Sequence, residues 1–342
     1  MGHSSSVTDG ANPIRTRGQR QVGLGAATFL LTVVAVSGCV GSTTAGRRAT
    51  GSGGQPTTSS PVAASSGPGA SHPCGTVAGP TATYQHVIWI WMENHTASEV
   101  LGSADAPYTT ALARQCGRAA QYASVGSPSL PNYLGATSGD THGIGDDDPP
   151  ARHPLAVANL FQQVRAAGQT ERSYEESMSS PCQLDADGEY AVKHNPAPYY
   201  VGPGDRAACA RDDVSLGTTT GGALRQDLEQ GTLPAFSFIT PNLCSDTHDC
   251  PVRDGDRWLE QWMPLILDSG AYHQGRTVVF VVWDEPTPMP LVVISPRTTP
   301  GTVASLSLSH YALLRTTEEL LGLSPLLGHA AGAPSMRAAF GL

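Results

Sequence analysis

Two short apolar runs limit the choice of fold more than any other feature of this chain. Residues 84–92 (YQHVIWIWM) and 276–283 (RTVVFVVW) are rich in β-branched and aromatic residues, and their apolar cores do not alternate with polar ones. A strand of this kind is buried on both faces, as in a parallel sheet covered by helices. We therefore expect both runs to form buried strands.

Helix and strand patterns alternate along the rest of residues 73–342. Further strands are expected at 120–124, 170–174, 235–240 and 291–294, and helices at 107–119, 131–138, 155–167, 223–228, 257–269 and 309–321. Strands separated by helices predict an α/β fold with a mostly parallel sheet and helices on both faces. In such folds ligands bind beyond the carboxyl ends of the strands.

Charge is distributed unevenly along the 342 residues, whose net charge is −9. Residues 1–72 carry five Arg and one Asp, whereas residues 73–342 carry 15 basic and 28 acidic residues. An acidic body without a basic run argues against nucleic-acid binding and against a polybasic membrane patch. No run of 18 apolar residues occurs, which argues against a multi-span membrane protein.

Residues 1–39 have the layout of an export signal. A basic segment at 15–20 precedes an apolar stretch at 22–36, which ends in Val36-Ser37-Gly38-Cys39. This ending fits a lipobox, in which Cys39 is lipidated and becomes the mature N-terminus. We predict a lipoprotein signal peptide over 1–39 and a lipid anchor on the outer face of the cell membrane. Ordinary secretion and an uncleaved anchor are the alternatives.

Residues 40–72 consist mainly of Gly, Ser, Thr, Ala and Pro, with almost no large apolar side chains. Such a segment cannot bury enough surface to offset the entropy of ordering it. We predict a flexible linker over 40–72 and a single folded domain over 73–342.

Six cysteines remain once Cys39 is set aside from the seven in the chain. An even number in an oxidising compartment predicts three disulfides, for which fifteen pairings exist. The most local pairing joins Cys74 to Cys116, Cys182 to Cys209 and Cys244 to Cys250. A zinc site is the alternative, although the chain has no C-x₂-C spacing.

Polar clusters accompany the apolar segments. Met92-Glu93-Asn94-His95 ends the first run, Trp283-Asp284-Glu285 ends the second, and SPSLPNY at 127–133 lies between them. Buried acids are costly unless they are paired or bound to a cation, and oxygen donors suit hard divalent ions. A metal-centred site is one interpretation, and acids in ordinary loops are the other.

Ser129 stands at the predicted start of a helix. Serine is a preferred N-cap, and Pro131 would fall in the first helical turn. A hydroxyl there faces free N–H groups and the positive end of the helix dipole, which favour an anionic oxygen and a bound phosphate. The alternatives are that Ser129 only caps the helix, or that the nucleophile is Ser127.

Two basic residues are further candidates for a binding role. Lys193 is the only lysine in the chain and lies beside His194 and Asn195, which indicates either a need for an ammonium or chance retention. His248 lies in the segment CSDTHDC at 244–250, where it could bind an anion or a metal, or be an ordinary surface histidine.

Taken together, these motifs resemble the bacterial phosphoesterase family of secreted acid phosphatases and phospholipases C. The resemblance covers about 84–325 and rests, in family order, on MENH at 92–95, PSLPNY at 128–133, KHNP at 193–196, TPN at 240–242, DTHD at 246–249, WDE at 283–285 and SHY at 309–311. It is strongest with the short acid phosphatase branch, which includes a phosphatase of phosphatidylinositol 3-phosphate.

The resemblance implies an alkaline-phosphatase-like, three-layer α/β/α sandwich. It also implies an acid phosphatase that hydrolyses phosphate monoesters, phosphoinositides included, through a phosphoserine intermediate. A positively charged histidine near the phosphate would be in keeping with an acid optimum.

The resemblance further assigns roles to particular residues. Ser129 is the implied nucleophile, beside one divalent metal ion of unspecified identity. The implied metal ligands are Glu93, Asn94, Asp284 and Glu285. The implied phosphate-binding residues are Lys193 and His248, with His194 and Asn132 as companions.

Three other functions compete with this one. A phospholipase C-type phosphodiesterase shares the motifs. A sulfatase would need Arg where the chain has Tyr133. A solute-binding lipoprotein would explain residues 1–72 but not the polar clusters. The sequence lacks nucleotide-binding glycine motifs, so we expect no cofactor besides the metal, and it indicates no protein partner.

Overall fold

The computed structural model describes residues 72–342. The predicted signal peptide over 1–39, its lipidation site Cys39 and nearly all of the predicted linker over 40–72 lie outside the described residues. Within residues 72–342, no helix has the length and apolar character that crossing a bilayer requires.

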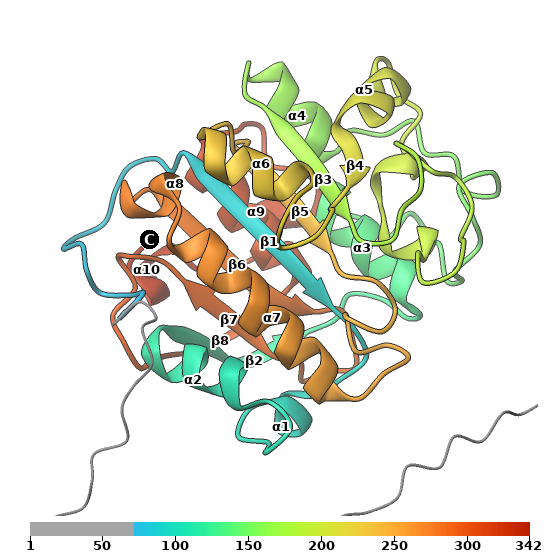
Figure 1. The fold of residues 1–342 in the computed structure, drawn as a ribbon. Coiled ribbons are helices and arrows are strands. Elements are labelled where there is room, and N and C mark those ends of the chain that lie inside the picture. The colour runs from blue at the N-terminus through green and yellow to red at the C-terminus, as the bar shows by residue number, and fades with distance from the viewer. Residues whose placement is uncertain (1–71) are drawn as a thin grey trace, which may run out of the picture. The chain divides into compact units, whose positions relative to one another are not determined.

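Among the described residues, eight strands form one sheet in the order β4-β3-β5-β1-β6-β7-β2-β8 (Figure 1). The strands are β1 (His86–Met92), β2 (Gly117–Ala123), β3 (Glu171–Glu175), β4 (Asp213–Ser215), β5 (Phe236–Thr240), β6 (Thr277–Trp283), β7 (Leu291–Ile294) and β8 (Thr302–Ser309). Neighbours pair in parallel, except that β7 is antiparallel to β6 and to β2. The mostly parallel sheet predicted from the sequence is confirmed.

Helices cover both faces of the sheet, which gives the three layers of an α/β/α sandwich (Figure 1). One layer contains α2 (Pro107–Gln115), α6 (Ala223–Gln230), α7 (Val252–Leu267) and α8 (Gly270–His273). The other contains α3 (Ser129–Ser138), α4 (Leu160–Ala166) and α9 (His310–Leu321). The remaining short helices are α1 (Ala97–Val100), α5 (Asp205–Asp212) and α10 (Arg337–Phe340), with 3₁₀ turns η1 (Val192–His194), η2 (Ala197–Tyr199) and η3 (Gly328–Gly332).

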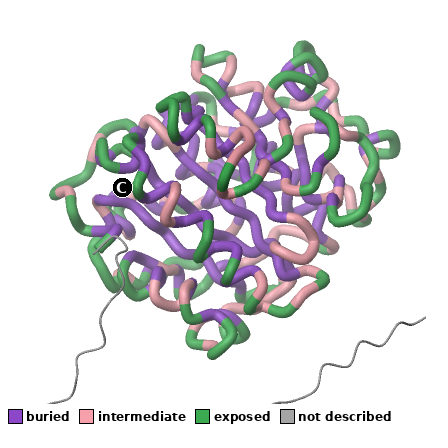
Figure 2. Tube along the Cα trace, in the orientation of Figure 1, coloured by how far each residue is buried: buried purple, intermediate pink, exposed green. Residues whose placement is uncertain are grey.

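The two apolar runs lie side by side at the centre of the sheet. β1 pairs with β5 on one side and with β6 on the other, and residues 87–92 and 277–283 are buried throughout. Figure 2 shows this buried trace through the middle of the molecule. Because helices cover both faces, neither strand has a solvated side, and polar residues do not alternate along it.

One helix prediction extends too far. The helix expected at 107–119 ends at Gln115, and the strand expected at 120–124 begins at Gly117. Gly117 already pairs with Thr302 of β8, and Cys116 is bonded to Cys74. Sheet pairing and the disulfide therefore override the local helical pattern.

A second helix prediction begins too early, and some elements were not predicted. The helix expected at 155–167 begins at Leu160, because the Asn159 side chain caps it by accepting the Gln162 N–H at 2.9 Å. The edge strand β8 and the helix α5 were also missed. Half of the residues of β8 (TVASLSLS) are polar and most are not buried, so it lacks the continuous apolar signal of β1 and β6.

Three disulfides join Cys74 to Cys116, Cys182 to Cys209 and Cys244 to Cys250. Their Cα atoms lie 5.2, 5.2 and 4.6 Å apart. The most local of the possible pairings is confirmed, and the zinc alternative is wrong because all six sulfur atoms are in these bonds.

Candidate active site

Two carboxylates lie side by side at the carboxyl edge of the sheet. Met92 and Trp283 pair in register at the ends of β1 and β6, so Glu93 and Asp284 leave the sheet at the same level. Both are fully buried, with 0% of their surface exposed. The backbone N–H of Asn94 donates to Asp284 Oδ1 at 3.1 Å, which ties the two strand ends together.

Ser129 lies against this pair. Its hydroxyl donates to Glu93 Oε2 at 3.1 Å, and the residue is only 2% exposed. The expectation that Ser129 is the N-cap of its helix is wrong by one position, because Pro128 takes the extended conformation of the cap and Ser129 is the first residue of α3. The positive end of the helix dipole still lies at this hydroxyl.

The other carboxylate oxygen of Glu93 accepts a hydrogen bond from a residue of the same helix, α3. Tyr133, one turn beyond Ser129, donates its hydroxyl to Glu93 Oε1. The Tyr133 ring stacks on His194 with centroids 5.3 Å apart, and His194 Nε2 lies 3.4 Å from Glu93 Oε2. Glu93 is thus at the centre of the site.

A third carboxylate, Asp246, approaches from the loop after β5. Its backbone carbonyl accepts the Glu93 N–H at 2.8 Å, and its side chain is fully buried. Asp246 Oδ2 lies 3.2 Å from His194 Nδ1, so His194 has a carboxylate at each ring nitrogen.

The three carboxylates are difficult to ionise together. Burial, followed by the charges of Asp284 and Asp246, raises the pKa of Glu93 well above its usual value. Burial raises the pKa of Asp246 to about 8 and that of Asp284 to about 7. Burial also lowers the pKa of His194 well below its usual value, so this imidazole provides no positive charge to offset them.

The predicted metal ligands fit a divalent cation. Asp284 Oδ2 is buried and has no hydrogen-bond partner among the described residues, which is the condition of a carboxylate that lacks its counter-ion. Asn94 and Glu285 are half-buried at the same edge as Glu93 and Asp284. Hard oxygen donors of this kind suit a divalent ion. In addition, Glu93, His194 and His248 present ligand atoms within 4.8 Å of one another.

Lys193 and His248 lie beside this cluster. Lys193 Nζ donates to Asp147 Oδ2 at 2.9 Å and to His248 Nε2 at 3.3 Å. His248 Nδ1 lies 2.6 Å from Asp249 Oδ1, and the rings of His248 and His194 are 5.5 Å apart. The structure therefore brings the predicted phosphate-binding residues Lys193, His194 and His248 together, and their roles stay predictions.

The side chain of Asn132 has no polar atom free for a phosphate. Its oxygen accepts the N–H groups of Val125 and Gly126, both at 2.9 Å, and its amide nitrogen donates to the carbonyls of Gly126 and Pro128. The residue is also fully buried. Asn132 thus holds the loop that precedes Ser129, in place of the direct phosphate contact that we predicted.

His310, in the SHY motif at the start of α9, supports the strand end behind Asp284. Its Nε2 donates to the Asp284 carbonyl at 2.8 Å, and its Nδ1 accepts the Tyr122 hydroxyl at 2.9 Å. Burial lowers the pKa of His310 to about 4, so the ring stays neutral and keeps this arrangement.

Sequence reasoning assigned no role to Asp246, Tyr133 or Asp147. The i, i+4 spacing of Ser129 and Tyr133 on one helix face could have indicated Tyr133. Asp246 stands in the DTHD motif, but nothing in the sequence shows that it is buried. Asp147 reaches the site from a loop, and no pattern predicts that contact.

The sequence model of the Phosphoesterase family matches residues 88–289. The chain belongs to this family. It is 29% identical to a phosphatidylinositol-3-phosphatase of Mycobacterium tuberculosis over 76% of this chain and 84% of that protein. It is 25% identical to a phosphate-repressible acid phosphatase of Penicillium chrysogenum over 59% of this chain, and it spans about half of that relative, 48% of its length.

Solved structures confirm the alkaline-phosphatase-like fold. A protein of the alkaline phosphatase superfamily from Vibrio parahaemolyticus superposes with a TM-score of 0.50 at 13% identity, covering 78% of this chain and 74% of that one. The lipoteichoic acid synthase LtaP of Listeria monocytogenes superposes with a TM-score of 0.50 at 12% identity, covering 75% and 77%. At such identities the likeness concerns the fold alone.

Proposed function

We propose that this protein is an exported acid phosphatase that hydrolyses phosphate monoesters, with Ser129 as its nucleophile. The observation that carries the proposal is the place of the Ser129 hydroxyl. It lies at the N-terminus of α3, 3.1 Å from Glu93, beside buried carboxylates with which no Arg or Lys of residues 72–342 forms an ion pair. Family membership and the relatives named as phosphatases support phosphoester hydrolysis.

The proposed metal site is formed by Glu93, Asn94, Asp284 and Glu285. A divalent cation bound there would make the Ser129 hydroxyl more acidic and would offset the charge of the phosphate. The Ser129 hydroxyl donates its hydrogen bond to Glu93 Oε2, and this bond fixes the orientation of the Ser129 oxygen.

The reaction has two displacements at phosphorus. Ser129 Oγ forms a bond to phosphorus as the bond to the alcohol oxygen breaks, and the proton lost by the Ser129 hydroxyl is taken up by the leaving alcohol oxygen. Water then forms a bond to phosphorus as the Ser129–phosphorus bond breaks. One water proton returns to Ser129 Oγ, and inorganic phosphate is released. Lys193 and His248 face the phosphoryl oxygens and stabilise their charge through charge-assisted hydrogen bonds.

Substitution of Ser129 by Ala tests the proposal. We expect a loss of at least about 1000-fold in turnover of p-nitrophenyl phosphate at about pH 5–6, because the covalent step needs this oxygen. Ser127→Ala is the matched control, since Ser127 is exposed two residues away and should keep its activity. Acid-quenched wild-type enzyme should carry phosphate on the peptide that contains Ser129.

Several outcomes would contradict the proposal. If Ser129→Ala keeps more than a few per cent of the activity, Ser129 is not the nucleophile. Turnover only of bis-p-nitrophenyl phosphate would favour a phospholipase C-type phosphodiesterase. Stabilisation by a solute, without turnover of either ester, would favour a solute-binding lipoprotein.

Export and lipid anchoring are part of the proposal and rest on residues 1–39. Replacement of Cys39 by Ser removes the thiol that the lipid would modify. We expect this variant to leave the membrane fraction, with the phosphatase activity of its folded domain unchanged.

A further inference from the structure

The carboxylate of Asp147 bonds to two donor groups of the candidate active site. Its Oδ1 accepts the backbone N–H of Leu130 at 3.0 Å, next to Ser129 in the first turn of α3. Its Oδ2 accepts from Lys193 Nζ at 2.9 Å. One carboxylate therefore bridges an amide beside the nucleophile and the only lysine of the chain.

We infer that Asp147 is a displaceable internal anion, which fills the phosphate subsite in the free protein and is expelled when a phosphate ester binds. A carboxylate and a phosphate present similar oxygens to N–H and ammonium donors, so the two compete for the same groups. The inference rests on the proposed function, because it uses Lys193 and the start of α3 as the phosphate subsite.

The surroundings of Asp147 allow it to leave. The side chains of Asp147 and Lys193 are 27% and 22% exposed, so water can reach both groups as they separate. The loop that carries Asp147 contains Gly143, which has a φ of +72° and open space around it. Two other contacts of this loop involve the neighbours of Asp147 and not its carboxylate. His153 contacts Asp146, and the Tyr199 hydroxyl donates to the Asp148 carbonyl.

An internal anion has a definite consequence for affinity. Every phosphate that binds must first break the two contacts of Asp147 and then tolerate a negative charge nearby. Removing the charge while keeping the shape should therefore strengthen phosphate binding. A carboxylate that merely holds Lys193 in place would have the opposite effect, since Lys193 would lose its orientation.

The test compares Asp147→Asn with the wild-type protein, using inorganic phosphate as a competitive inhibitor of p-nitrophenyl phosphate hydrolysis at about pH 6. We expect the inhibition constant and the KM to fall by about 10-fold, with kcat changed by much less. Asp148→Asn is the matched control. It removes the same charge from the same loop, but its carboxylate lies 3.6 Å from Arg152 and contacts neither Leu130 nor Lys193.

A binding measurement separates this inference from the proposed function. Titration calorimetry of inorganic phosphate into Ser129→Ala and into Ser129→Ala with Asp147→Asn needs no turnover. Tighter binding by the double variant supports the inference even if the wild-type protein fails to hydrolyse any ester. Equal or weaker binding overturns it even if the wild-type protein is an active phosphatase. If Asp147→Asn does not fold, Asp147→Ser serves in the same comparison.

Discussion

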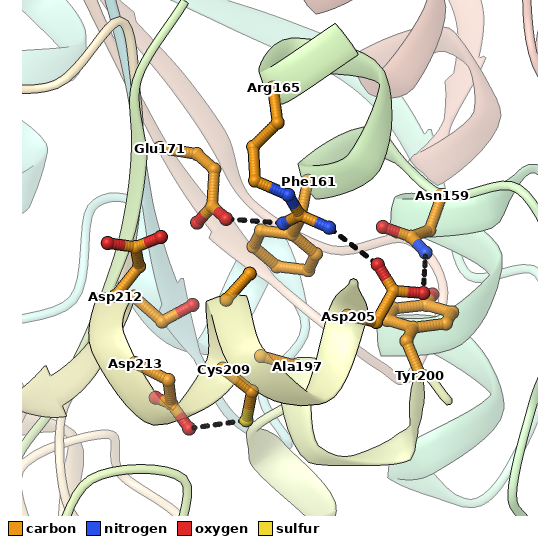
Figure 3. A pocket seen from close by; sticks show the side chains of 12 residues that line it. Asn159, Phe161, Arg165, Glu171, Ala197, Tyr200, Asp205, Cys209, Asp212 and Asp213 are labelled. Carbon is orange, nitrogen blue, oxygen red and sulfur yellow. Dashed lines mark hydrogen bonds and ion pairs between the residues drawn. The ribbon is translucent and has the colours of Figure 1, made fainter. Parts of the chain in front are cut away.

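Two groups of buried acids differ in how their charge is balanced. The edge carboxylates, Glu93, Asp246 and Asp284, lie at the carboxyl ends of the central strands. The cavity carboxylates, Glu171, Asp205 and Asp213, surround a cavity of about 10 Å³ among α4, α5 and β3, which has room for about one water molecule (Figure 3). None of the predicted site residues lines this cavity.

The cavity carboxylates have partners within the chain. Figure 3 shows the Arg165 guanidinium between Glu171 and Asp205, with contacts of 2.5 Å to each. The Asn195 amide donates to both oxygens of Asp213, at 3.0 and 2.9 Å. The three cavity carboxylates therefore have hydrogen-bond or ion-pair partners among the described residues, as expected of acids with a structural role.

The edge carboxylates have no such partner. Among residues 72–342, no Arg or Lys forms an ion pair with Glu93, Asp246 or Asp284, and burial keeps their neighbour His194 neutral. Asp284 Oδ2 is left without a hydrogen bond. The two groups thus differ in whether a cation of the chain lies among them, as Arg165 does between Glu171 and Asp205.

The largest effect should come from exchanging one carboxylate in each group. We expect Asp284→Asn to lower kcat/KM by at least about 100-fold, because a ligand of the proposed metal is lost. Its stability in the presence of a chelator should be equal to or higher than that of the wild type, since repulsion from Glu93 is removed. Asp205→Asn should show the reverse, with lower stability and unchanged activity per folded molecule. Urea unfolding measures the stability of both variants, and steady-state kinetics measure their activity. Equal changes in the two variants would contradict the proposed difference between the two groups of acids.

A smaller effect is expected from removing the internal cation. Arg165→Leu leaves Glu171 and Asp205 buried without their partner, which should lower the free energy of unfolding by about 3 kcal/mol. Arg152→Leu is the control, because Arg152 pairs with Asp148 at 3.6 Å with both side chains exposed and should cost no more than about 0.5 kcal/mol. Equal losses in the two variants, measured by urea unfolding, would show that the cavity group does not depend on Arg165.

The smallest effect concerns a buried acid that is balanced by a proton. Glu318 of α9 accepts the Leu327 N–H at 2.8 Å, its other oxygen has no partner, and burial raises its pKa to about 7. The folded state therefore holds a proton that the unfolded state releases above about pH 4.5, so the contribution of Glu318 to stability is greatest below pH 4.5 and falls as pH rises through 7. Between pH 5 and 8, the free energy of unfolding of Glu318→Gln should fall by about 1 kcal/mol less than that of the wild type. Parallel pH profiles of unfolding would contradict this.

The sequence predicts those parts of the molecule that depend on local pattern. The apolar runs at 84–92 and 276–283 identify β1 and β6, and the polar residues that follow them bring Glu93 and Asp284 to one edge of the sheet. Contacts between distant loops have no such pattern. Asp147 reaches Leu130 across 17 residues, and Asp246 is buried only because the loop after β5 folds over Glu93. Burial that depends on contacts between distant loops is known only from the three-dimensional structure.

The disulfide between Cys244 and Cys250 encloses Asp246 and His248, both of which lie beside His194 of the candidate site. A covalent bond across six residues lowers the conformational entropy of that segment when it is unfolded. With its thiols reduced, this segment would lose that covalent restraint. If the protein is exported as proposed, the restraint on Asp246 and His248 forms only where thiols are oxidised, outside the reducing cytoplasm.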